Sequence, residues 1–191
     1  FIKKSQGFGL LDAQDSKTKN LDIRKNKKNI VALGEVGLDF KEDSTNKERQ
    51  KANFKKIIEL SLELDIPLIV HSRKAEAEVI EMLEKLGAKK VVMHCFSGNF
   101  KLVKRIIDNG WTFSIPASVR HSEHFEKIAK EAPIEQLLCE SDSPYLHPFK
   151  ERNNEPAFVV EAYRKIADIK KIDLKKVEKI IEENFSKLFI S

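Results

Sequence analysis

The sequence has few cysteines, no long apolar run and neither of the two common nucleotide-binding loops. Its two cysteines, Cys95 and Cys139, form no C-x-x-C pair, which favours a reducing cytoplasm over a disulfide-rich secreted class. No stretch approaches the roughly 18 apolar residues of a membrane span, and no signal-peptide pattern opens the chain, so we expect no membrane partner. No G-x-G-x-x-G or G-x-x-x-x-G-K-[ST] loop follows an apolar segment, which removes the commonest nucleotide-binding functions.

The net charge of +5 does not extend over the whole chain. Residues 1–29 hold eight Lys/Arg and three Asp/Glu, a difference of +5, whereas the remaining 162 residues hold 27 of each. Residues 30–191 therefore have no basic excess with which to attract a polyanion over long range. If this protein binds phosphate groups, bound cations or a local cluster must supply the attraction.

Short apolar segments alternate with amphipathic ones beyond a polar N-terminal segment. We expect residues 1–29 to be irregular and residues 30–191 to form one domain. The apolar segments predict strands, at residues 30–34, 67–70, 90–93, 111–115 and 136–139. The amphipathic segments predict helices, at residues 47–64, 75–86, 101–109, 123–130, 156–168 and 174–188. Gly87 and Gly110 fall where two of these helices end and a positive φ is needed. This α/β order fits an open doubly wound sheet or a (β/α)8 TIM-type barrel.

Four potential metal ligands lie at or just beyond the carboxyl ends of the predicted strands. They are Glu35, His71, His94 and Asp142. In parallel α/β folds these ends face the active-site mouth, so we expect the four side chains to converge. Imidazole and carboxylate ligands suit divalent Zn, Mn, Co or Fe, and a carboxylate-rich site can hold Mg. A glutamate can bridge two cations, and an aspartate beside a metal can act as a general base.

Each of these residues also has a purely structural interpretation. A single histidine at a strand end is often only a hydrogen-bonded core residue. Glu35 could pair with a lysine, and Asp142 could cap the turn before Pro144. The convergence of four such residues on one sheet edge nevertheless favours the metal site.

Several blocks, in order, resemble the TatD family of metal-dependent deoxyribonucleases, which are amidohydrolase-like barrels. The blocks are Gly34–Phe40 (GEVGLDF), Pro67–Arg73, His94–Gly98 (HCFSG), Glu140–Leu146 (ESDSPYL), Asn154–Ala157 (NEPA) and Asn184–Phe189. Over residues 30–190 the resemblance implies a TIM-type barrel and one or two divalent ions. It implies that Glu35 bridges two metals, that His71 and His94 ligate one of them, and that Asp142 ligates metal and handles the proton of an attacking water. The activity it implies is hydrolysis of DNA phosphodiester bonds, often from a 3′ end.

Four further residues are candidates for contacts with the DNA. Arg73 and Arg120 follow strand ends and suit phosphate, although surface arginines are as often simply solvated. Ser97 precedes a helix whose N-terminal N–H groups could receive an anion. We expect His121, His124 and His147 to be solvated, with His147 alone near enough to the rim to contact substrate. We expect both cysteines to pack against helices.

The sequence departs from the family pattern at its N-terminal end. The H-x-H strand that completes one metal site and the following His-Pro pair are absent, and the chain is shorter than the about 250 residues of a closed barrel. We expect a missing part or self-association to complete the barrel, since exposed strand edges are a liability. Two alternatives to a DNase remain: a metal-dependent hydrolase of an amide, lactone or phosphomonoester, and a binding paralogue with impaired catalysis.

Overall fold

The computed structural model describes residues 23–150 and 153–190, and the chain divides into two compact units. The first unit ends at Val91 and the second begins at Val92, and each is described by itself. The elements of the first unit are the 3-10 helix η1 (Lys27–Asn29), strands β1 (Leu33–Asp39) and β2 (Leu68–Arg73), and helices α2 (Lys47–Leu64) and α3 (Glu76–Leu86).

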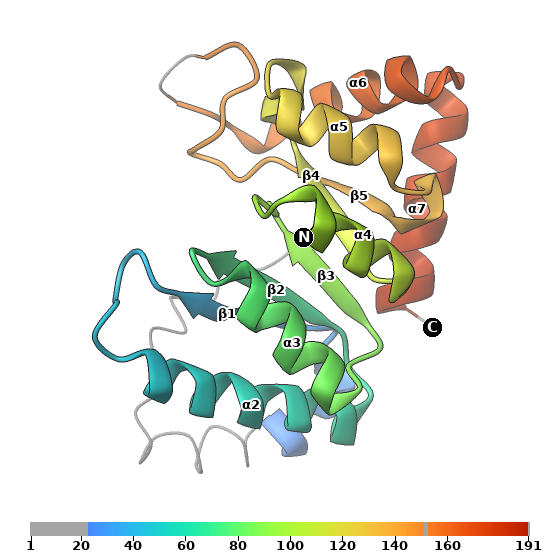
Figure 1. The fold of residues 1–191 in the computed structure, drawn as a ribbon. Coiled ribbons are helices and arrows are strands. Elements are labelled where there is room, and N and C mark those ends of the chain that lie inside the picture. The colour runs from blue at the N-terminus through green and yellow to red at the C-terminus, as the bar shows by residue number, and fades with distance from the viewer. Residues whose placement is uncertain (1–22, 151–152, 191) are drawn as a thin grey trace. The chain divides into compact units, whose positions relative to one another are not determined.

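The first unit is a parallel strand pair covered by two helices (Figure 1). Leu33 of β1 lies opposite Leu68 of β2, and Gly37 lies opposite His71. The register between the strands shifts between Leu33 and Val36, so a bulge or a similar irregularity falls in this part of β1. Helices α2 and α3 bury their apolar faces, and α2 ends at Asp65, which adopts a left-handed conformation.

The second unit contains three strands and a larger set of helices. The strands are β3 (Val91–His94, which starts at the boundary), β4 (Thr112–Pro116) and β5 (Leu137–Glu140). The α-helices are α4 (Phe100–Asp108), α5 (Glu123–Glu131), α6 (Val160–Lys170) and α7 (Leu174–Phe189). The 3-10 helices are η2 (Ala117–Arg120), η3 (Ile134–Gln136) and η4 (Pro156–Val159).

The strands β3, β4 and β5 are parallel and paired in that order. Their side chains are buried on both faces, which explains the continuous apolar runs of the sequence. Helix α6 packs against both α5 and α7 (Figure 1), and all three helices contact the strand segments or their connections. The carboxyl ends of β3, β4 and β5 therefore form a common edge, where His94 ends β3 and Glu140 ends β5, while Ser114 lies in the middle of β4.

Most of the expected elements are present with small shifts of their ends. The helix over residues 47–64 has the predicted bounds, and Gly87 and Gly110 have φ of 72° and 70° as expected. The first strand was placed too early, because β1 runs from Leu33 to Asp39. The expectation of an irregular segment before residue 30 is wrong for its described part. Residues 23–25 are helical, η1 follows, and Arg24 pairs with Glu63 of α2 at 2.7 Å; the earlier residues, 1–22, lie outside the described ones.

Candidate metal and phosphate site

Glu35 and His71 lie on neighbouring strands of the first unit. Glu35 does not end its strand, as the sequence suggested, but lies inside β1 within the irregular part of the register. His71 lies opposite Gly37, two residues before the end of β2. A Cβ atom at Gly37 would lie 1.9 Å from the His71 carbonyl oxygen, and Gly37 has a φ of 147°. Only glycine allows β1 to approach the backbone of His71 this closely.

The carboxylate of Asp39 orients the imidazole of His71. Asp39 Oδ2 lies 3.2 Å from His71 Nε2, and since a carboxylate accepts, Nε2 carries the proton and Nδ1 keeps the lone pair. Gln50 of α2, which is buried, holds the Asp39 backbone through a 2.8 Å contact. Burial acts to raise the pKa of Asp39, but two backbone N–H donors and His71 outweigh it, so this pKa lies below its ordinary value.

In the second unit, Glu140 is the centre of a hydrogen-bonded cluster that orients His94. Glu140 Oε2 lies 2.6 Å from His94 Nδ1 and also accepts from the Ser114 hydroxyl at 2.6 Å. Glu140 Oε1 accepts from the Cys95 backbone N–H at 3.1 Å. One carboxylate therefore joins the ends of β3, β4 and β5. Because Nδ1 donates to Glu140, Nε2 of His94 keeps the lone pair that a metal needs.

Asp142 lies beside Nε2 of His94, the ring nitrogen that does not contact Glu140. Its Oδ1 is 3.7 Å from His94 Nε2, and both side chains are partly buried. The position just past β5 was predicted correctly. Asn154, which is buried, holds this segment by donating to the backbone carbonyl oxygens of Ser141 at 2.6 Å and Tyr145 at 2.5 Å. The imidazole of His94, at the end of β3, thus lies next to a carboxylate on a loop that Asn154 holds.

The two arginine candidates both have acidic partners. Arg73 Nη1 lies 2.9 Å from Glu42 Oε1 and 3.9 Å from Asp39 Oδ2. Arg120 Nη1 lies 2.6 Å from Oε2 of Glu161, a buried residue of α6. Both guanidinium groups remain partly exposed, so neither arrangement hides the cation from an approaching anion.

The other two substrate candidates differ in exposure. Ser97 is exposed before α4, where the Asn99 side chain already accepts from the N–H groups of Lys101 and Leu102. The expectation that His147 is solvated is wrong, because this residue is only 5% exposed and packs against Phe149 and Phe158. Contact of either residue with substrate stays a prediction.

Of the other two histidines expected to be solvated, His121 is exposed. His124 is half-buried, with its Nε2 3.1 Å from the Phe96 carbonyl oxygen.

The structure brings together pairs within each unit and adds residues that the sequence reasoning missed. It pairs His94 with Asp142 in the second unit and places Glu35 and His71 on paired strands in the first. The missed residues are the ones that orient these groups: Asp39, Ser114, Glu140 and Asn154. Asp39 and Glu140 each end a strand, and that position was a signal for both.

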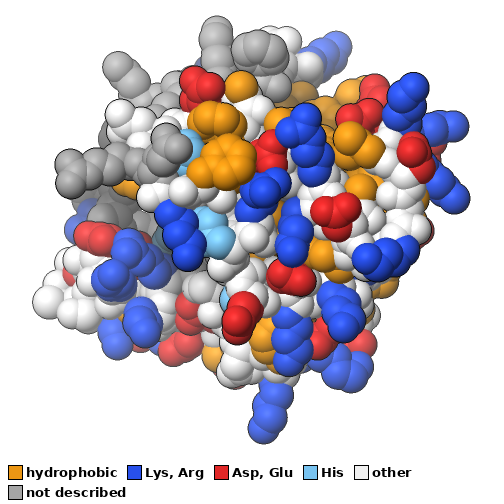
Figure 2. All heavy atoms as spheres, turned by 90° about the horizontal axis from the view of Figure 1, so that it is seen from above, with side chains coloured by type: hydrophobic (Ala, Val, Ile, Leu, Met, Phe, Trp, Pro, Cys, Tyr) orange, Lys and Arg blue, Asp and Glu red, His pale blue; other side chains and the backbone are white. Residues whose placement is uncertain are grey.

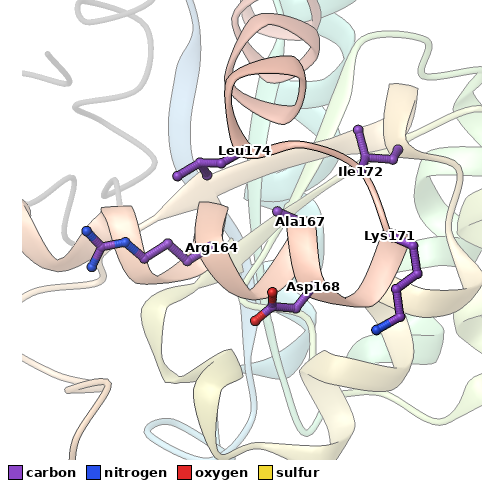
Figure 3. A pocket seen from close by; sticks show the side chains of 6 residues that line it. All are labelled: Arg164, Ala167, Asp168, Lys171, Ile172 and Leu174. Carbon is purple, nitrogen blue, oxygen red and sulfur yellow. The ribbon is translucent and has the colours of Figure 1, made fainter.

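A separate hollow of about 380 Å³ lies on the helical side of the second unit. Figure 3 shows Arg164, Asp168 and Lys171 around it, with Ile172 of the α6–α7 connection and Leu174 at the start of α7. Its lining contains none of the residues of the Glu140 cluster. We therefore assign the hollow no part in catalysis.

The visible surface charge agrees with the expectation from composition. On the face drawn in Figure 2, basic and acidic side chains are intermingled, as expected from the equal charges of residues 30–191. Among the described residues, no helix combines the length and apolar character needed to cross a membrane.

Comparisons with known proteins give a consistent result. Residues 9–190 match the family described as TatD related DNase, so the match begins before the blocks identified above. An uncharacterized metal-dependent hydrolase of Bacillus subtilis, YabD, is 32% identical over 99% of this chain and 78% of its own length. Human deoxyribonuclease TATDN3 is 34% identical over 96% of this chain and 70% of its own length. An uncharacterized metal-dependent hydrolase of Methanocaldococcus jannaschii, MJ1582, is 37% identical over 87% of this chain and 66% of its own length.

Solved structures show the same fold. The Escherichia coli TatD homologue YJJV superposes with a TM-score of 0.86 and 20% identity, over 94% of this chain and 71% of that one. A TatD family hydrolase from Entamoeba histolytica gives 0.82 and 24% identity, over 93% of this chain and 69% of that one. The predicted α/β class of TIM type is confirmed.

Proposed function

Because this chain belongs to the TatD family of metal-dependent hydrolases, we propose that it hydrolyses DNA phosphodiester bonds, from a single-stranded or 3′ end. The observation that carries the proposal is the orientation of His94 by Glu140 beside Asp142. The name of the human relative, a deoxyribonuclease, supports the choice of DNA. We propose in addition that the protein is located in the cytoplasm and that self-association completes the barrel.

The donor set fits a divalent cation of the Mg, Mn or Zn class. Glu35, His71 and His94 carry ligand types that could hold a metal ion, and Asp142 adds a second carboxylate. The contacts within each unit agree with this, since Asp39 and Glu140 each leave one imidazole nitrogen of the adjacent histidine with its lone pair. In the proposal Glu35 would be the carboxylate shared by two cations.

The residues divide the work of hydrolysis between them. A cation held by this set supplies charge for the phosphate oxygens and lowers the pKa of an attacking water. Asp142 would accept the proton of the attacking water, because its Oδ1 lies 3.7 Å from Nε2 of His94, the nitrogen available to a metal. Glu140 keeps the His94 ring in one orientation throughout.

Three exposed or partly exposed residues contact the DNA backbone in this proposal. The guanidinium groups of Arg73 and Arg120 bind phosphate oxygens, and Ser97 is a further contact. The buried His147 acts indirectly, by holding Phe149 in place. Since residues 30–191 have no net charge, local groups of this kind, together with the cations, must supply the attraction.

The test compares Asp142→Ala with wild type on single-stranded DNA, with Mg²⁺ or Mn²⁺ and with a chelator. We expect wild-type degradation that the chelator abolishes, and a loss of at least about 100-fold in Asp142→Ala, as for removal of a general base. Asp168→Ala, on the remote hollow, is the matched control and should behave as wild type. Equal activity in Asp142→Ala and wild type would reject the proposal. A panel of amide, lactone and phosphomonoester substrates distinguishes a hydrolase of another bond, and metal binding without turnover on any substrate indicates a binding paralogue.

A further inference from the structure

We propose that Tyr145 and Phe149 form a stacking platform for unpaired nucleobases, so that the segment beyond Asp142 selects single-stranded DNA. The inference rests on the proposed phosphodiesterase function and names the part of the substrate that this segment recognises. We call residues 141–150 the rim segment.

The first observation is exposed aromatic surface on the rim segment. Tyr145 is 72% exposed and Phe149 is 48% exposed, and among the described residues the third exposed aromatic is Phe185 of α7. An exposed aromatic ring offers a face on which another ring can stack. Two of the three exposed rings thus lie on the short segment that also carries the proposed catalytic Asp142.

The second observation is how closely the backbone joins Tyr145 to Asp142. The Tyr145 N–H donates to the Asp142 carbonyl oxygen at 2.9 Å, which closes a four-residue turn. The Cα atoms across such a turn are less than about 7 Å apart. A base that stacks on Tyr145 therefore belongs to a nucleotide next to the phosphodiester bond at Asp142.

The third observation is that the Tyr145 backbone and the Phe149 ring are held in place. Asn154 donates to the Tyr145 carbonyl oxygen, and the Phe149 ring packs edge-to-face with His147 and Phe158, with centroids 5.8 and 5.9 Å away. The Phe149 N–H also donates to Nδ1 of the buried His147 at 3.1 Å. A pre-positioned ring loses little conformational freedom when a base stacks on it, so the contact favours binding.

The fourth observation is a cation stacked on one face of the Phe149 ring, which leaves the other face for a base. The Arg120 guanidinium lies over this ring, 5.1 Å from its centre, and contacts Glu161 through Nη1. Stacking rings interleaved with a cation are the combination by which proteins bind single-stranded nucleic acid. A duplex offers its bases only in stacked pairs, so this combination favours unpaired ends.

The experiment measures binding separately from hydrolysis. The probe is a single-stranded oligonucleotide with phosphorothioate linkages and a 2-aminopurine at its 3′ end, whose fluorescence is quenched by stacking; a blunt duplex of the same sequence is measured in parallel. The variants are Tyr145→Ala, Tyr145→Phe and Phe149→Ala, with Phe185→Ala as a matched exposed aromatic outside the rim segment.

We expect Tyr145→Ala and Phe149→Ala each to weaken single-strand binding about tenfold and to lose the quench. Tyr145→Phe should bind within about twofold of wild type, because stacking needs the ring and not the hydroxyl. Phe185→Ala should match wild type. The preference of wild type for the single strand over the duplex should fall in both alanine variants.

Single-strand binding by Tyr145→Ala as tight as that of wild type would overturn the platform, as would equal binding of single strand and duplex by wild type. Should the rim segment dock a protein instead, the alanine variants would leave DNA binding intact. The proposed function fails in a different way: wild type would bind and quench the probe yet degrade no unmodified DNA with any divalent metal.

Discussion

His94 Nδ1 lies 2.6 Å from Glu140 Oε2, and this contact decides which nitrogen of the ring can bind a metal. Replacing the carboxylate by an amide in Glu140→Gln removes its charge and allows the ring to adopt the other tautomer. Loss of an outer partner of this kind costs about 10- to 100-fold in metal affinity. Titration of the protein with Mn²⁺ by calorimetry measures the change.

Glu135→Gln is the control for this prediction. Glu135 is an exposed glutamate of η3 just before β5, so its amide should leave the affinity unchanged. An affinity in Glu140→Gln equal to that of wild type would show that His94 needs no carboxylate to hold its tautomer.

Asn154 should stabilise the segment that carries Asp142. In Asn154→Ala the carbonyl oxygens of Ser141 and Tyr145 lose a common donor, and unsatisfied buried groups cost about 1–3 kcal/mol. We expect a free energy of unfolding lower by that amount in urea titrations, and a fall in kcat. Asn153→Ala is the adjacent exposed control and should stay within about 0.5 kcal/mol of wild type. Equal stabilities for the two variants would contradict the assignment.

Gly37 should tolerate no side chain. Alanine there would place its Cβ 1.9 Å from the His71 carbonyl oxygen, so β1 and β2 must separate. We expect Gly37→Ala to lose at least about 3 kcal/mol of unfolding free energy. Gly87→Ala is the matched control, since it also has a positive φ but nothing within 4 Å, and should cost about 1 kcal/mol. A mild effect of Gly37→Ala would mean that the strands can shift without cost.

Asp43 should make the stability of the first unit depend on pH in the acid range. Hydrogen bonds from Asn46 and Thr45 lower its pKa from 3.8 to about 2. A lowered pKa in the folded state stabilises the fold above the unfolded value, and this contribution is lost as the pH falls from 3.8 towards 2. Urea titrations of wild type and Asp43→Ala should therefore differ by a constant amount near neutral pH and converge in that window. Asp43→Asn cannot ionise and should keep the part of these contacts that does not depend on pH. A difference in unfolding free energy between wild type and Asp43→Ala that persisted to pH 2 would exclude the mechanism.

The sequence predicts the order of elements and the residue types at strand ends, but not the details of β1. Helix α2 was predicted with its bounds because its apolar residues recur at helical spacing and Asp65 ends the run. The strand of Glu35 was placed too early, since two glycines interrupt its apolar pattern and the bulge cannot be read from composition. The family resemblance is confirmed by the match over residues 9–190.

The sequence could not predict how the side chains of the candidate site are oriented. That Glu140, Ser114 and His94 meet depends on the pairing of three strands, which separates the residues by up to 46 positions along the chain. The burial of His147 depends in the same way on Phe149 and Phe158. Local pattern carries no information on such long-range packing.

The acceptance of three donors by Glu140 has a consequence for attempts to change the metal preference. Ser114, His94 and the Cys95 backbone share two oxygens, so a new ligand at position 94 alters the bonds available to the other strands. Libraries that vary position 94 alone should yield mostly poorly folded proteins. Varying positions 94, 114 and 140 together gives each new ligand a chance of finding a compatible neighbour.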